Sequence, residues 1–66
     1  MVRVKILESN TVIEIDAEEL TVRELLEKLG LSMSEHLVLR DNTVLTEEDV
    51  LKKNDEVVVY TVKSGG

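Results

Sequence analysis

One amphipathic segment near the middle of the chain limits the folds that are open to it. Its apolar residues recur at positions i, i+3, i+4 and i+7, the spacing of a single stripe along a helix: Val22, Leu25, Leu26 and Leu29. Residues 21–24, Thr-Val-Arg-Glu, predict a capping box at the start of this helix. Gly30 predicts a left-handed ending, with Leu31 closing back on Leu26 in a Schellman motif. A helix with one apolar face must bury that face against a second layer.

Alternating apolar and polar residues on both sides of the helix predict strands, and these strands can supply the second layer. We expect strands over 2–6, 11–15, 36–40, 43–45 and 56–63. Turns are expected at Glu8-Ser9-Asn10 and at Asp41-Asn42, since Asn and Asp tolerate a left-handed backbone. Residues 46–49 are expected to cap a single helical turn that runs through Leu51. This order of elements predicts one two-layer α+β domain over residues 1–63, followed by a flexible tail over 64–66.

Because there is only one helix, one face of the sheet is expected to remain uncovered. Alternation along each strand predicts which side chains lie on that face. On strand 36–40, His36 and Arg40 are expected to point to water, so that Val38 points with them. Leu37 and Leu39 would then point to the helix.

The last strand is interpreted in the same way, starting from Tyr60, which suits a half-exposed position. If Tyr60 faces outward, Val58 does so too, while Val57 and Val59 face the helix. The expected partner-binding patch is therefore Val38, Arg40, Val58 and Tyr60, with Leu7 as a further candidate at its edge. Exposed apolar patches often mark interaction sites, although single exposed valines are common on protein surfaces. An error of one residue in register would exchange the two faces.

Composition excludes several classes of function. The chain has no cysteine and only one histidine, His36, so neither a thiolate nucleophile nor a histidine-based metal cluster is expected. Its three glycines do not form a phosphate-binding loop. The acidic residues at 16–19 and 47–49 precede apolar positions and are interpreted as helix-start electrostatics rather than as a catalytic carboxylate pair. A chain of 66 residues also has little structure to spare for an internal cavity, so function is expected on a surface or at a terminus.

The charge of the chain bears on its partners and its location. A formal net charge of −6 argues against nucleic acid, whose phosphates would repel the chain, and favours a partner with a basic surface. The same charge could serve solubility alone. No apolar run approaches a membrane span, and no signal peptide is evident, so a cytoplasmic monomer is expected.

The C-terminal Gly65-Gly66 is the unusual part of the chain. Two glycines cannot pack, but they can enter conformations that are closed to other residues, which suits a carboxylate that must thread a narrow channel. The whole ending, from Asn54-Asp55-Glu56 through the apolar strand to Gly66, resembles the ending of the ThiS/MoaD sulfur-carrier family. Residues 38–44, Val-Leu-Arg-Asp-Asn-Thr-Val, look like the strand, Asn turn and return strand of that family. Asn54 stands where the family usually has Gly, and Lys63-Ser64 replaces a more apolar pair.

The resemblance implies a β-grasp, ubiquitin-like fold, with a mixed sheet of four to five strands packed on one main helix. It also implies that the chain is a carrier and not an enzyme. An E1-like enzyme of the ThiF/MoeB kind would use ATP to adenylate the carboxylate of Gly66. A thiocarboxylate would follow, and its sulfur would pass to a downstream enzyme of cofactor or tRNA biosynthesis. The chain itself would bind no cofactor, and ATP would belong to the partner.

Two other functions remain open at this stage. A ubiquitin-like modifier would use the same activation but would be joined through Gly66 to lysines of target proteins. A non-covalent β-grasp binding module would use the sheet patch, and its Gly-Gly ending would be incidental.

Overall fold

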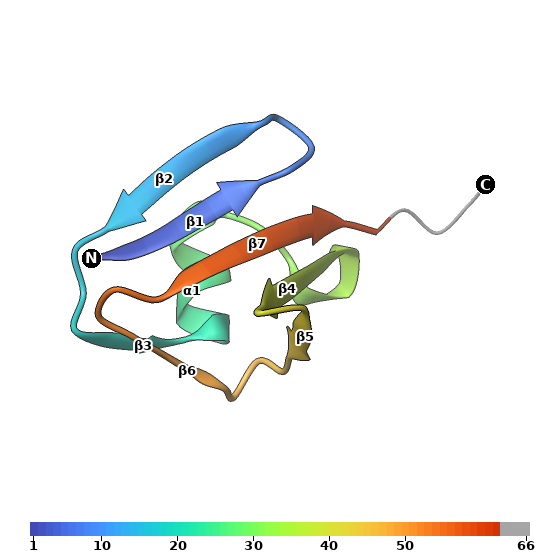
Figure 1. The fold of residues 1–66 in the computed structure, drawn as a ribbon. Helices are drawn as coiled ribbons and strands as arrows, with labels where there is room; N and C mark the ends of the chain where they lie inside the picture. Colours follow the sequence, from blue (N-terminus) through green and yellow to red (C-terminus); the bar gives the residue numbers. More distant parts are fainter. Residues whose placement is uncertain (63–66) are drawn as a thin grey trace.

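The computed structural model describes residues 1–62, and these form two layers around one core (Figure 1). The elements follow one another as β1 (Val2–Ile6), β2 (Thr11–Ile15), β3 (Glu19–Thr21), α1 (Val22–Leu29), the 3-10 turn η1 (Met33–Glu35), β4 (His36–Arg40), β5 (Thr43–Leu45), β6 (Val50–Lys52) and β7 (Glu56–Thr61).

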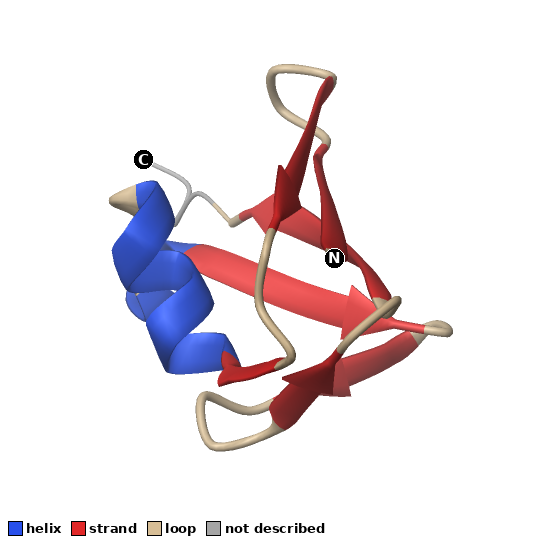
Figure 2. Cartoon of the chain, turned by 90° about the vertical axis from the view of Figure 1, so that its left-hand side faces the viewer, coloured by secondary structure: helices blue, strands red, loops and turns tan. Residues whose placement is uncertain are grey.

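The main sheet has five strands in the order β2-β1-β7-β4-β5. β1 and β7 are parallel, and the other neighbouring strands are antiparallel. The short strands β3 and β6 form a separate antiparallel pair. Helix α1 packs on one face of the main sheet (Figure 2). This mixed five-stranded sheet with one helix confirms the predicted α+β class and the β-grasp architecture.

The core lies between the sheet and the helix and consists of aliphatic side chains. Among residues 1–62, the buried set is Val2, Val4, Leu20, Val22, Leu25, Leu26, Val38, Leu45, Leu51, Val57 and Val59. The predicted helix stripe supplies three of these residues, and Leu29 packs against them from a partly buried position. Every layer therefore contributes apolar area to one cluster. Burial of this area supplies the free energy that outweighs the loss of chain entropy in so small a domain.

Both predicted ends of α1 are confirmed. The Thr21 hydroxyl accepts from the Glu24 N–H (3.1 Å), and the Glu24 carboxylate accepts from the Thr21 N–H (2.9 Å), which is the reciprocal capping box. Gly30 has φ 71°, and the Leu31 N–H donates to the Leu26 carbonyl (2.9 Å) as in a Schellman motif. Local sequence signals therefore fix the length of this helix.

The tight turns also follow the sequence prediction, because they use left-handed Asn and Asp residues. Positive φ occurs at Asn10 (51°), Asp41 (52°), Asn42 (64°) and Asn54 (73°). Two successive positive values at Asp41 and Asn42 are the mark of a two-residue type I′ hairpin turn. Asn54 stands where the family that this chain resembles usually has Gly. It adopts the left-handed backbone conformation that favours glycine.

The helical turn predicted over 46–51 is wrong. The Asp49 carboxylate accepts from the Thr46 N–H (2.7 Å), and the chain turns once before it enters β6. In β6, Leu51 pairs with Leu20 of β3, and both side chains are buried. This pairing buries two leucines and provides backbone partners for Glu19–Thr21, a strand that was not predicted. The strand pairing is therefore favoured over the helical turn that the local sequence signals predicted.

The loop before β6 also completes the start of α1. The carbonyl of Asp49 accepts from the Val22 N–H (2.9 Å), and that of Glu47 accepts from the Arg23 N–H (3.1 Å). The Arg23 guanidinium donates to the Glu47 carboxylate, and this hydrogen bond raises the pKa of Arg23. Amides at a helix start have no partner within the helix, and here a distant loop supplies the acceptors.

Truncation of one core residue should be far more costly than truncation of an exposed one. We expect Leu26→Ala to lower the free energy of unfolding by ~2–5 kcal/mol, because Leu26 is 1% exposed and its loss leaves a cavity. The control is Val12→Ala, since Val12 is 56% exposed and should change stability by less than ~0.5 kcal/mol. Urea denaturation followed by circular dichroism measures both, and equal losses would contradict this account of the core.

Candidate functional site

The face of the main sheet that is turned away from α1 is the candidate partner-binding surface. On β7 the predicted alternation is confirmed: Val57 and Val59 are buried, at 2% and 0% exposure, whereas Tyr60 is 43% exposed. Val58 lies between them at an intermediate exposure and, by alternation, faces the same side as Tyr60. The facing of the last strand was therefore predicted correctly from its single aromatic residue.

On β4 the predicted facing is wrong by one residue. Val38 is fully buried and pairs with Val59, so it belongs to the core and not to the patch. Leu37, which was expected to face the helix, is 41% exposed and pairs with Tyr60. Leu39 pairs with Val58 and shares the outer face.

The error arose from the assumption that polar residues on β4 must face water. His36 and Arg40 lie at the two ends of the strand, on the core side, where polar partners are within reach. The His36 Nδ1 atom lies 2.8 Å from the Ser32 carbonyl oxygen. The Arg40 side chain reaches the segment between β6 and β7. A charged residue at a strand end can thus share the face of buried neighbours if it has such partners.

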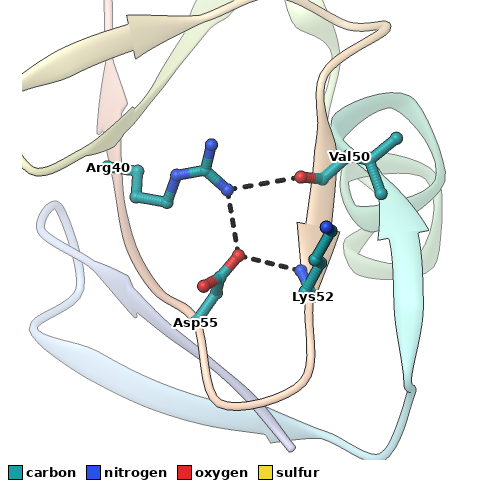
Figure 3. A network of polar contacts seen from close by, with 4 residues as sticks. All are labelled: Arg40, Val50, Lys52 and Asp55. Atoms are coloured by element: carbon teal, nitrogen blue, oxygen red, sulfur yellow. Dashed lines mark hydrogen bonds and ion pairs between the residues drawn. The ribbon is translucent and has the colours of Figure 1, made fainter.

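Arg40 therefore does not share a face with Val58 and Tyr60, contrary to the prediction. Its side chain takes part instead in a polar network with Val50, Lys52 and Asp55 (Figure 3). Its Nη1 donates to the Asp55 Oδ2 (2.9 Å) and to the Val50 carbonyl (3.3 Å). The same Asp55 oxygen accepts from the Lys52 N–H (2.8 Å). Both charged side chains are about one third exposed or less, at 33% and 28%, so water screens this pair less than a surface pair. The network fastens β4 to β6 and to the turn before β7.

The cross-strand register defines the uncovered surface that the structure does present, which we call the outer patch. Its residues share the outer parity of their strands: Val12, Leu37, Leu39, Val44, Val58 and Tyr60. Four of them are among the exposed large apolar residues of the described chain: Val12, Leu37, Val44 and Tyr60. Of these six residues, only Val58 and Tyr60 were predicted from the sequence. Leu37 and Leu39 were not predicted, because residues 37–39 are all apolar and no alternation shows which of them face outward.

Leu7, the further candidate at the edge of the patch, lies beside Tyr60. These two residues line an open hollow together with Glu8 and Thr61. The Leu7 N–H donates to the Val59 carbonyl (3.1 Å), which extends the β1–β7 pairing, and the Thr61 hydroxyl donates to the Glu8 carboxylate. The hollow therefore adjoins the outer patch at the C-terminal end of β7.

Backbone bonding holds the chain to the sheet beyond the end of β7. The Val62 N–H donates to the Glu35 carbonyl (2.7 Å), next to the start of β4. The outer patch thus adjoins the point from which residues 63–66 follow. Those residues, with the predicted attachment positions Gly65 and Gly66, lie outside the described part of the chain, and their predicted roles stay predictions.

Within residues 1–62, no group of three or more His, Cys, Asp or Glu side chains is arranged to hold a metal ion. No helix in this part of the chain is long and apolar enough to cross a membrane.

Comparison with known protein families shows which family the chain belongs to. A family model described as the ThiS family matches residues 3–66. The chain belongs to the ThiS family. Members of this family are small carrier proteins rather than enzymes, and membership implies an interaction with an E1-like enzyme. No curated protein matched the sequence.

Aspartate substitutions should separate the two faces of β4 and β7. We expect Val38→Asp and Val59→Asp to unfold the domain, because each would bury a carboxylate with no partner. Leu37→Asp and Tyr60→Asp should leave it folded, since both side chains already contact water. Thermal melting of the four variants measures this difference. If Val38→Asp stayed folded while Leu37→Asp unfolded, the register of β4 would be wrong.

Removal of the carboxylate that joins β4 to β6 should destabilise the domain. Asp55→Ala leaves the Arg40 guanidinium and the Lys52 N–H without their shared acceptor, and we expect a loss of about 1–3 kcal/mol. Glu14→Ala is the matched control, because the Arg3–Glu14 pair is more than half exposed and should contribute less than about 1 kcal/mol. Urea unfolding midpoints measure both variants. Equal effects would show that the Arg40 network is no more than a surface ion pair.

Proposed function

We propose that this chain is a sulfur carrier whose Gly66 carboxylate is activated as an adenylate and then converted to a thiocarboxylate. The observation that carries the proposal is the ThiS family match, which extends to residue 66 and so includes Gly65-Gly66. The β-grasp architecture and an uncovered apolar face next to the end of β7 support it.

The proposed chemistry needs an activating enzyme, because a carboxylate oxygen is a poor leaving group. The Gly66 carboxylate would attack the α-phosphorus of ATP, and the bond to the bridging oxygen would break, with release of pyrophosphate. A sulfur nucleophile at the oxidation level of sulfide would then attack the acyl carbon, and AMP would leave with the bonding electrons. The product is a thiocarboxylate on Gly66, which can donate its sulfur to a product of cofactor or tRNA biosynthesis.

In this proposal the described residues bind and position, and the partner supplies the catalysis and the ATP. The outer patch offers an apolar docking surface of the kind that marks interaction sites. Backbone hydrogen bonds hold the chain to the sheet as far as Val62. A partner that binds the outer patch would therefore also set the position from which residues 63–66 follow. Docking and delivery of the carboxylate would thus be linked through a rigid strand.

A ubiquitin-like modifier would share the adenylate and differ in the acceptor, which would be a lysine amine of a target protein. Intact-mass analysis of the chain purified from its own source distinguishes the two outcomes. A carrier shows exchange of one oxygen for sulfur at the C-terminus, whereas a modifier is recovered in isopeptide-linked conjugates.

Activation should depend on the position of the terminal carboxylate. Deletion of Gly66 withdraws the carboxylate by roughly 3.3–3.6 Å, and misplacement by about 1 Å can already cost about 10²-fold in rate. We therefore expect the deletion to lower ATP–pyrophosphate exchange by at least about 10²-fold with a matching E1-like enzyme. Gly66→Ala should also impair exchange, because a Cβ obstructs close approach.

Ser64→Ala is the matched control, since it changes the same segment without adding a Cβ, and it should retain exchange. Wild-type rates for the chain that lacks Gly66, with an enzyme proven active on another carrier, would overturn the proposed function.

A further inference from the structure

One cation, Lys5, stands between two residues of the outer patch. Lys5 is exposed on β1, pairing in register with Val12 of β2 on one side and with Val58 of β7 on the other. The row continues across the sheet through Leu39 to Val44. Lys5 is therefore the single charge in a row of five outer residues, one from each strand, and the other four are aliphatic.

No carboxylate among residues 1–62 forms an ion pair with Lys5. The nearest acidic positions on the neighbouring strands are Glu14 and Glu56, and both stand in register with Arg3 rather than with Lys5. The Glu14 carboxylate lies 3.4 Å from the Arg3 guanidinium. Within residues 1–62, the ion pairs are Arg3–Glu14, Arg23–Glu47 and Arg40–Asp55, and none includes Lys5.

This arrangement limits what can cover the patch. A partner that buried the apolar row would remove water from the Lys5 ammonium, and an unpaired buried charge is costly. A second copy of this chain, docked face to face about a two-fold axis that runs along the row, would set the two Lys5 residues opposite each other and be disfavoured. A partner with a carboxylate inside its own apolar surface would instead satisfy the charge.

We infer that the surface that docks on the outer patch carries a carboxylate, set among apolar side chains, that pairs with Lys5. The inference rests on the proposed function for the identity of the partner, the E1-like activating enzyme. The overall charge of −6 favours a basic approach surface at long range, whereas Lys5 requires the opposite sign at the contact. The ion pair between Lys5 and that carboxylate would fix the register of docking. Surfaces that lack the carboxylate would bind less well.

The test is a charge series at Lys5, with the Michaelis constant for the carrier measured by ATP–pyrophosphate exchange. Lys5→Arg should stay within about twofold of wild type. Lys5→Gln should raise the Michaelis constant about threefold to tenfold, and Lys5→Glu more than about tenfold, because it places two like charges in contact. The value of kcat should not change, since the reacting carboxylate is untouched.

Lys28→Glu is the matched control. It makes the same change in net charge from an exposed position on α1, on the other side of the sheet. We expect it to leave the Michaelis constant within about twofold of wild type, so that a loss at Lys5 reports local contact and not overall charge.

Equal losses for Lys5→Gln and Lys5→Glu would overturn the inference, because a carboxylate of the partner at this contact repels Glu but not Gln. An unchanged Michaelis constant together with self-association of Lys5→Gln would also overturn it, and would show that Lys5 only prevents contact between copies. Absence of exchange for the wild-type chain, with an enzyme proven on another carrier, would instead count against the proposed function.

Discussion

The pairing of β7 with both β1 and β4 is the interaction on which the rest of the domain depends. β7 joins the N-terminal hairpin to the β4–β5 hairpin, so without it the main sheet separates into two parts. Its inward residues Val57 and Val59 are buried in the core, and its outward residues Val58 and Tyr60 form the middle of the outer patch. One strand therefore connects the two halves of the sheet, contributes to the core and leads to the candidate attachment site.

Much of this fold could be predicted from the sequence where the signals are local. The capping box at Thr21, the left-handed Gly30 and the left-handed Asn and Asp turns are properties of a few adjacent residues, and each is found in the structure. β3 and β6 could not be predicted in this way. They exist because Leu20 and Leu51, far apart in the chain, bury each other.

The candidate surface was predicted only in part, for a related reason. Tyr60 is a single amphipathic residue in an apolar strand, and that asymmetry determined the facing of β7. Residues 37–39 carry no such asymmetry. The polar residues at the ends of β4 led to the wrong prediction, because their partners, Ser32 and Asp55, lie outside the strand. Which face of β4 is buried is settled by its pairing with β7, whose residues lie 19 to 25 positions further along the chain.

The parallel pairing of β1 with β7 has a consequence for how the protein is made. Residues 3–6 have no partner on that side until residues 56–59 have been synthesised, so the main sheet cannot close before β7 has been made. Formation of the sheet must therefore wait until β7 has left the ribosome, and long-range pairings of this kind fold slowly. A chain cut short before β7 lacks the strand that joins its two hairpins and is exposed to proteases. Folding of the domain thus reports the presence of β7, since only molecules that include residues 56–59 can close the main sheet.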